Sequence, residues 1–331
     1  MVAVSPSRSQ PMSAPAPRLE AQDWALLLAL SLLWGASYFF SKVAVGALPP
    51  LTVVGARVFL AAATLLLVCR LAGVPLPLDR WRDFLGMGAI NNVLPFALIF
   101  WAQTEIASGL ASILNATTPL FTALLAHALT RDERLTTAKV MGVALGIGGV
   151  AVLVGIEVLE SLGGSILPEL ACLAAAVFYA CAGIFARRRL KGVPPLASAA
   201  GQLAASSAMA LPIMAVVDRP WLLPLPDASI IGALLGLALL STALGYAIYF
   251  RVLARAGATN ILLVTLLIPP SAILLGALIL DERLDPHHLA GFAAIALGLA
   301  AIDGRPLGWL KRKRAAGGSG GPSLETIRRK A

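Results

Sequence analysis

The chain has 331 residues, of which 58% are hydrophobic and only 13% are charged, and its mean hydropathy is +0.84. Soluble domains carry about 25% charged residues, so this composition excludes an ordinary water-soluble fold and predicts a protein whose solvent is the lipid bilayer. The net charge of +9 comes without zinc-ligand spacing or an aromatic RNA-binding motif, and nucleic acid is therefore not an expected partner. The three cysteines all lie in apolar runs, so we expect no disulfide, no metal site and no cofactor.

The first 22 residues are rich in Pro, Ser and Ala and lack an early apolar core, which is typical of a disordered tail rather than of a signal peptide. After this tail the sequence predicts ten membrane-spanning helices, because each of ten apolar runs approaches the roughly 20 residues that cross a hydrocarbon core. The predicted spans are 24–46, 51–72, 83–102, 107–129, 138–156, 167–186, 194–217, 228–250, 258–280 and 286–303. A loose basic tail, 304–331, follows the last span.

Most of the 26 Lys and Arg residues lie in the two tails and in every second loop between the predicted spans. Loops rich in Lys and Arg stay on the cytoplasmic side of a membrane. This distribution supports the predicted spans and predicts that both termini are cytoplasmic. The positive charge is therefore interpreted as a signal of topology rather than as a binding surface.

The tetrapeptide DERL occurs twice, at Asp132–Leu135 and at Asp281–Leu284, and the two copies are 149 residues apart. Further pairs recur at nearly the same offset: the turns Gly46–Val54 and Lys191–Ala199, the prolines Pro119 and Pro269, and the glycines Gly142 and Gly291. Five spans separate the copies, and an odd number reverses the direction of the chain. We therefore predict two inverted five-helix repeats, 23–156 and 167–303. Inverted repeats favour alternating access around a site in the middle of the membrane.

Three stretches of the sequence carry a family resemblance. Residues Leu32–Ala62, which hold a Trp-Gly pair followed by Lys, Pro and Arg, resemble the start of the EamA-type repeat, and Ala111–Leu153 and Asn260–Ala300 resemble its end. Over residues 22–303 the chain is therefore similar to the ten-helix drug/metabolite transporter superfamily. The resemblance implies a helical basket around a central cavity lined mainly by helices one, three, four, six, eight and nine, with helices five and ten as a peripheral scaffold.

The same resemblance implies a transporter of the bacterial inner membrane. Members of this superfamily mostly export amino acids, metabolites or drugs, and relatives carry nucleotide sugars or sugar phosphates. The second half of this chain departs from the pattern, because Tyr179 and Ala180 stand where a Trp-Gly pair is expected and Gln202 stands opposite Arg57. The two halves are therefore not expected to contribute equivalent side chains.

Polar and aromatic side chains inside the spans are the candidate substrate ligands, because polar groups in a bilayer are costly and often functional. Those predicted to bind substrate are Trp34, Ser37, Tyr38, Asn91, Asn115, Thr118, Phe178, Tyr179, Tyr246, Tyr249 and Thr265. For the Ser and Thr residues the alternative is a hydrogen bond to the backbone of their own helix. A helix proline frees a backbone carbonyl, and those predicted to act in gating or flexing are Pro95, Pro119, Pro269 and Pro270. An aromatic and amide cavity without fixed charge would suit small zwitterions or amphipathic metabolites.

All 17 Asp and Glu residues fall in loops, tails or helix ends. A proton-coupled mechanism built on a buried carboxylate is therefore not expected, and uniport or exchange is the leading hypothesis. The small multidrug transporters, which this fold resembles, depend on a glutamate in helix one that this chain lacks. Arg57 is expected to snorkel outward or to bond a neighbouring carbonyl, with binding of a substrate carboxylate as the alternative. The pattern Gly142-x-x-x-Gly146 favours close packing within one chain, so we expect a monomer.

The function that these features favour is export of small metabolites by alternating access, above all of neutral or aromatic amino acids. The alternatives are a carrier of drugs or of phosphate-bearing metabolites such as nucleotide sugars and, in another class, a passive channel. An enzyme is not expected, because the sequence has no HExxH motif, no nucleophile elbow and no pair of intramembrane aspartates, and His287 and His288 lack evident zinc partners. The expected partners are a small molecule and membrane lipid.

Overall fold

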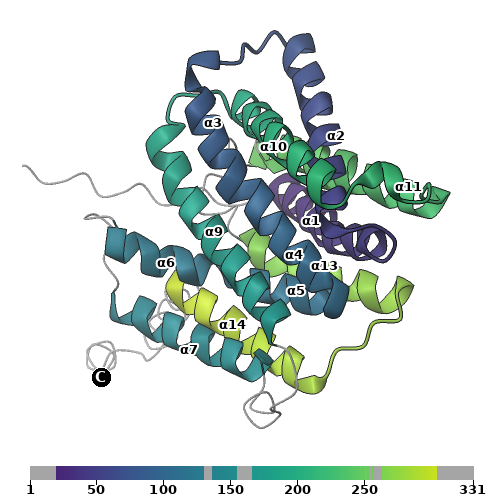
Figure 1. The fold of residues 1–331 in the computed structure, drawn as a ribbon. Helices are drawn as coiled ribbons and strands as arrows, with labels where there is room; N and C mark the ends of the chain where they lie inside the picture. Colours follow the sequence, from purple (N-terminus) through teal and green to yellow (C-terminus); the bar gives the residue numbers. More distant parts are fainter. Residues whose placement is uncertain are drawn as a thin grey trace, which may run out of the picture.

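Figure 1 shows the computed structural model of the chain, which describes residues 20–129, 136–154, 166–249, 251–252, 255 and 263–303. Within these ranges every regular element is a helix and there is no strand, so the predicted all-α membrane fold is confirmed. The α-helices are α1 Ala21–Val45, α2 Pro50–Leu71, α3 Trp81–Gly88, α4 Leu94–Glu105, α5 Ser108–Asn115, α6 Thr118–Leu129, α7 Thr137–Val154, α9 Leu167–Arg189, α10 Pro195–Val217, α11 Ala228–Leu235, α13 Leu263–Ile279 and α14 Pro286–Asp303. The shorter elements are η1 Leu78–Arg80, η2 Ala89–Val93, η3 Pro220–Leu222 and η4 Gly236–Leu244.

Seven helices in the described part of the chain are long and apolar enough to cross a membrane, namely Ala21–Val45, Pro50–Leu71, Leu78–Glu105, Ser108–Leu129, Leu167–Arg189, Pro195–Val217 and Ala228–Tyr249. Three of these seven combine successive elements: η1, α3, η2 and α4 in the third, α5 and α6 in the fourth, and α11 and η4 in the last. The helices α7, α13 and α14 are also apolar but have only 18, 17 and 18 residues. These lengths lie at the lower end of what spans a bilayer, so the predicted total of ten depends on these three helices.

The two halves of the chain begin their second helices in the same way. Pro50 is the first residue of α2 and Pro195 is the first residue of α10, and each belongs to one of the matching Pro-Pro-Leu turns. A proline at the first helical position has no N–H to leave unpaired, and its fixed φ already suits a helix. The recurring turn in the sequence therefore starts equivalent helices in the two halves.

Equivalent helices of the two halves pack against each other in opposite directions. At the start of α2, the hydroxyl of Thr52 donates to Asp218, which follows the last residue of α10. One turn later in α2, Gly55 lies against Met214, which is one turn earlier in the chain than Asp218. In α7 and α14, a Cβ on Gly142 would meet the carbonyl of Gly298, and seven residues later a Cβ on Gly149 would meet the carbonyl of Gly291, seven residues earlier. Both pairs are therefore antiparallel, as an inverted repeat requires.

The first helix of each half packs against the other half. Helix α1 lies along α13 and η4, while α9 lies along α4 and α6. Each half therefore packs its first helix into the other half, and the two halves do not form separate five-helix units. Helices α7 and α14 lie side by side at one edge of the bundle (Figure 1), where α7 packs only against α14 and α6 among the closely contacting described helices.

Two segments of π-helix interrupt the helices Leu78–Glu105 and Ala228–Tyr249 at matching places. These helices correspond to the third and eighth of the ten predicted spans and are called the third and eighth crossings. The two segments are η2, which contains Asn91 and Asn92, and η4, which contains Ser241 and Thr242. In η2 the cause lies just downstream, because Pro95 has no N–H to donate back into the preceding turn. In η4 the hydroxyl of Thr242 donates to the carbonyl of Leu237 at 2.8 Å, five residues earlier. These segments widen the helices where polar side chains turn inward.

Candidate functional site

A cavity of about 410 Å³ lies in the centre of the bundle and is lined by residues of both halves. Of the residues predicted to bind substrate, those that line it are Trp34, Ser37, Tyr38, Asn91, Asn115, Thr118, Tyr179, Tyr246, Tyr249 and Thr265. Phe178 does not line it. Neighbouring residues of an α-helix point about 100° apart, so the turn of α9 that aims Tyr179 at the cavity carries Phe178 away from it.

Aromatic rings form much of the cavity wall. Trp34 and Tyr38 come from α1, Tyr179 comes from α9, and Tyr246 and Tyr249 come from the end of the eighth crossing. The rings of Trp34 and Tyr249 are stacked, with their centroids 5.7 Å apart and their planes at 30°. Because α1 and the eighth crossing belong to different halves, this stack joins the two repeats at the cavity.

Amide side chains form a second part of the wall. The amide nitrogen of Asn91 donates to Gln202 Oε1 at 3.0 Å and to the hydroxyl of Tyr246 at 3.4 Å. Its neighbour Asn92 is fully buried and donates instead to Ser206 Oγ at 2.9 Å. Asn91 therefore serves the cavity, whereas Asn92 fastens η2 to α10.

The fourth crossing is broken beside the cavity. Helix α5 ends at Asn115 and α6 begins at Thr118, with Pro119 as its second residue. The hydroxyl of Thr118 donates to the carbonyl of Asn115 at 2.7 Å, so the backbone bond considered for such residues is present there. Among the described residues, none gives a hydrogen bond to the buried oxygen Asn115 Oδ1.

The prolines predicted to act in gating occupy three different settings. Pro95 lies in the first turn of α4, directly after η2, and Pro119 lies at the break between α5 and α6. Pro269 and Pro270 lie inside α13, which continues as a helix on both sides of them. The first two coincide with irregular backbone and the last two do not, and a role in gating stays a prediction for all of them.

Arg57 also lines the cavity, which corrects two expectations from the sequence. Its side chain does not snorkel outward, because the residue is only 7% exposed. Its guanidinium carbon lies 3.8 Å from the ring centroid of Phe96, and its Nε donates to Thr242 Oγ1 at 3.1 Å. The cavity is therefore not free of fixed charge. Two features of the sequence pointed to this position in the cavity. Arg57 lies seven residues, or about 10 Å, after the start of α2, and it aligns with Gln202 in the second half.

Three sets of hydrogen bonds join helices at the end of the bundle that the sequence predicts to face outward. The carboxylate of Glu282 accepts hydrogen bonds from Ser108 N at 2.9 Å and from Ser108 Oγ at 2.6 Å, at the N-terminus of α5. Asp218 accepts from Thr52 N at 2.6 Å at the N-terminus of α2. Lys42 Nζ donates to the carbonyl of Gln103 at 2.6 Å, at the C-terminus of α4.

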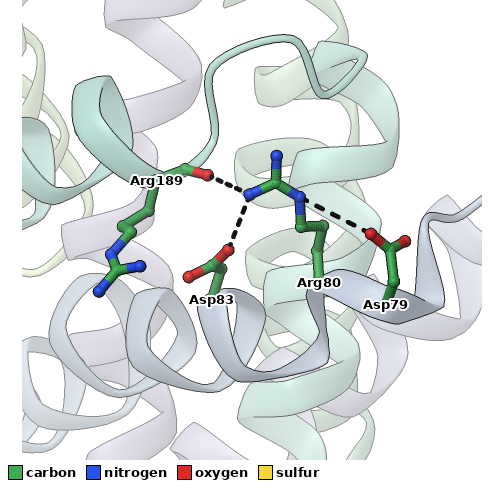
Figure 2. A network of polar contacts seen from close by, with 4 residues as sticks. All are labelled: Asp79, Arg80, Asp83 and Arg189. Atoms are coloured by element: carbon green, nitrogen blue, oxygen red, sulfur yellow. Dashed lines mark hydrogen bonds and ion pairs between the residues drawn. The ribbon is translucent and has the colours of Figure 1, made fainter.

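The opposite end of the bundle is joined by more exposed ion pairs. Figure 2 shows Arg80 between two helices, where its Nη1 donates to Asp83 at 3.2 Å and to the carbonyl of Arg189 at 3.2 Å, while its Nε lies 3.8 Å from Asp79. Since the side chain of Arg80 is 41% exposed, water screens these contacts. The hydrogen bonds at the predicted outer end are less exposed to such screening.

One cluster near the start of α14 has the side chains of a metal site. Potential ligand atoms of Asp285, His287 and His288 lie within 4.8 Å of one another, so the two histidines do have a neighbouring carboxylate, contrary to the expectation from the sequence. However, Asp285 is exposed, and Nδ1 of His288 already accepts a hydrogen bond from Asp285 N at 3.1 Å. The cluster lies outside the cavity lining.

Comparison with known proteins places the chain in a family. A model described as "EamA-like transporter family" matches residues 24–155 and again residues 166–302. A protein of Escherichia coli strain K12 named "Probable amino-acid metabolite efflux pump" is 29% identical over 302 residues, which cover 85% of this chain and 94% of that protein. One from Streptantibioticus cattleyicolor named "Probable terminal-alkyne amino-acid exporter" is 26% identical over 300 residues, which cover 90% and 98%.

A solved structure with 21% sequence identity shares the fold, with a TM-score of 0.60 over 85% of this chain and 97% of that chain. The family model matches once in each half of the chain, and the two matches together cover most of its length. They coincide with the two sets of helices that enclose the cavity. The protein belongs to the EamA-like transporter family and is an integral membrane transporter.

Proposed function

We propose that this transporter exports amino acids, in particular neutral and aromatic ones, by alternating access at the central cavity. The observation that carries the proposal is the cavity of about 410 Å³, which is walled by aromatic and amide side chains from both halves. This volume lies in the range of small-molecule sites. The printed names of two relatives, an amino-acid metabolite efflux pump and an amino-acid exporter, support the same substrate class.

The chemistry of the cavity wall suits a small molecule with an apolar or aromatic side chain. The rings of Trp34, Tyr38, Tyr179 and Tyr246 offer faces and edges for stacking. The amide of Asn115 and the hydroxyl of Ser241 offer polar atoms for a head group. A substrate held between these groups would touch both inverted halves, so a change in their relative packing would open the cavity to either side.

The coupling mode that we propose is uniport or exchange. No Asp or Glu is found among the cavity-lining residues in the described part of the chain, so nothing there offers a carboxylate that could carry a proton. The described acids in the helices lie in terminal turns, such as Asp23 in α1, Glu105 in α4 and Glu169 in α9. Transport should therefore persist when the pH gradient is collapsed with an ionophore.

The test is counterflow of labelled L-phenylalanine into proteoliposomes loaded with unlabelled amino acids. We expect saturable accumulation, which a passive channel would not give. Trp34→Ala and Tyr246→Ala should each raise the apparent KM by about tenfold, since an aromatic contact contributes on the order of 1.4 kcal/mol. Trp101→Ala is the matched control, because Trp101 is 42% exposed on α4 and does not line the cavity. Equal effects of the three substitutions, or uptake that never saturates, would refute the proposal.

A further inference from the structure

We propose that Arg57 binds the carboxylate of the transported molecule, so that a free carboxylate is a requirement for recognition. The inference deepens the proposed function and rests on it, because it identifies the head group that the same cavity selects.

Arg57 is a buried cation, since it is only 7% exposed. Within residues 20–129, 136–154, 166–249 and 263–303, no Asp or Glu forms an ion pair with it. A charge enclosed in a membrane protein is costly unless it is paired. Arg57 is also the one Lys or Arg among the described residues that line the cavity. A ligand carboxylate would supply the missing charge.

The guanidinium is held so that one edge stays available. Its face packs on Phe96 at 3.8 Å and, further away, on Phe100 at 5.7 Å, and its Nε is engaged by Thr242. In the described part of the chain no residue accepts a hydrogen bond from Nη1 or Nη2 of Arg57. These two nitrogens form the fork that binds a carboxylate through two parallel hydrogen bonds. The contacts thus fix the plane of the group and leave its binding atoms unused.

Two other unpaired atoms in the lining match the second charge of an amino acid. Asn115 Oδ1 and Ser241 Oγ are buried without a hydrogen-bond partner among the described residues, and Ser241 is the neighbour of the Thr242 that holds Arg57. Both oxygens accept hydrogen bonds, as a ligand ammonium requires. The cavity therefore offers donors for a carboxylate and acceptors for an amine.

The two repeats contribute different side chains to this site, and this difference orients the bound molecule. Gln202, which stands 145 residues after Arg57 at the equivalent place in the second half, also lines the cavity but is neutral and already accepts a hydrogen bond from Asn91. The carboxylate is therefore bound on the side of the first half. Gln202 also shows that a glutamine fits at this position of the fold, so Arg57→Gln is a suitable test substitution.

The experiment measures binding of four probes to the purified full-length protein by thermal shift and titration: L-phenylalanine, L-phenylalaninamide, phenylacetate and phenyl phosphate. We expect the two carboxylates to bind more tightly than the amide and the phosphate. Arg57→Gln should weaken binding of the carboxylates by about tenfold to a hundredfold, as for a lost charged hydrogen bond, and leave the amide unchanged. Arg57→Lys, which keeps the charge but loses the fork, should give a smaller loss. Arg70→Gln, at the exposed end of the same helix, should have no effect.

The inference is overturned if the amide binds the wild-type protein as tightly as the acid, if none of the carboxylates binds, or if Arg57→Gln weakens all four probes equally. Tighter binding of phenyl phosphate than of phenylacetate would overturn it in favour of a phosphate-bearing substrate. Counterflow separates this failure from that of the proposed function. If carboxylates bind through Arg57 but are never exchanged, the proposed transport of amino acids is refuted and the role of Arg57 is not. If the acid and the amide are exchanged equally, the role of Arg57 is refuted and the proposed transport is not.

Discussion

Removing the carboxylate of Glu282 should open the end of the bundle that is predicted to face outward. Glu282, from the loop between α13 and α14, caps the N-terminus of α5 by accepting hydrogen bonds from the N–H and hydroxyl of Ser108. Because α13 belongs to the second half and α5 to the first, these bonds join the two repeats at one end of the transport path. In the variant Glu282→Ala the N–H groups of α5 would be left to water.

The magnitude follows from the number and exposure of these bonds. Loss of a helix-capping side chain costs about 0.5–2 kcal/mol, and hydrogen bonds to a charged group contribute about 1.5–3 kcal/mol each when buried. Glu282 is partly exposed, so we take a value of about 1.4 kcal/mol for the closed state, after screening by water. This free energy corresponds to about a tenfold increase in the population that is open at this end.

The assay is the rate at which a membrane-impermeant maleimide labels a cysteine in the cavity of intact cells. Ser112→Cys is suitable, because Ser112 lines the cavity from α5 and is 1% exposed, and the native cysteines Cys69, Cys172 and Cys181 would be replaced. We expect about tenfold faster labelling with Glu282→Ala. The control Asp285→Asn removes an exposed charge from the same loop, three residues after Glu282. If Glu282→Ala labels no faster than this control, the contact does not keep that end closed and the reasoning is wrong.

Three further predictions concern the frame around the cavity. Gly142→Leu should destabilise the protein by about 1–3 kcal/mol and lower its Tm accordingly, because a Cβ there would lie 2.6 Å from the carbonyl of Gly298. The control Gly148→Leu should leave the Tm unchanged, because a Cβ on Gly148 would meet nothing within 4 Å. Equal Tm values for the two variants would contradict the packing of α7 on α14. Arg80→Ala should change the free energy of unfolding by less than about 1 kcal/mol, since its ion pairs are exposed, and a larger loss in chemical denaturation would show that this network matters more than its geometry implies. Hydrogen bonds from Ser229 and from the N-terminus of α11 lower the pKa of Asp227 below its ordinary value. The contribution of Asp227 to stability is therefore present above pH ~4 and lost at more acidic pH. The difference in Tm between the wild type and Asp227→Ala should become smaller on acidification. A difference that does not depend on pH would contradict a role of Asp227 as the helix cap.

The helices could be predicted well from the sequence, because apolar runs of about 20 residues have few other uses. Helix α2 begins at Pro50 and α10 at Pro195, each within a residue of the predicted span, and α9 continues three residues beyond its prediction to Arg189. The first DERL copy, Asp132–Leu135, and the two tails lie largely outside the described residues. The structure gives the second copy, Asp281–Leu284, a role, because its Glu282 caps α5.

The cavity was predictable where a residue type is costly in lipid. Trp34, Asn115 and Tyr246 lie deep inside their spans, and such groups turn toward the protein interior. Phe178 does not line the cavity; a phenylalanine is equally stable facing lipid, so its depth in the span does not decide where its side chain points. The depth of Arg57 and its alignment with Gln202 did not by themselves decide where its side chain points, since a long cationic side chain can reach either an interface or a cavity.

Apart from Pro95, which follows η2, the π-helical segments and the contacts at the two ends left no recognisable pattern in the sequence. In η4 the hydroxyl of Thr242 donates to the carbonyl of Leu237, five residues back, whereas threonines in helices ordinarily bond a carbonyl three or four residues back. The bond from Thr52 to Asp218 joins residues 166 positions apart. Local propensity says nothing about such long-range pairs, which form only when the two halves come together.

The most direct measurement of the central claim, two inverted halves around one cavity, is the side of the membrane on which the two DERL copies lie. Single cysteines at Arg134 and Arg283 would be labelled with an impermeant maleimide in right-side-out and in inside-out vesicles. We expect Arg283→Cys to react only from the outside and Arg134→Cys only from the cytoplasmic side. Reaction of both cysteines from the same side would contradict the inverted repeat, and with it alternating access at this cavity.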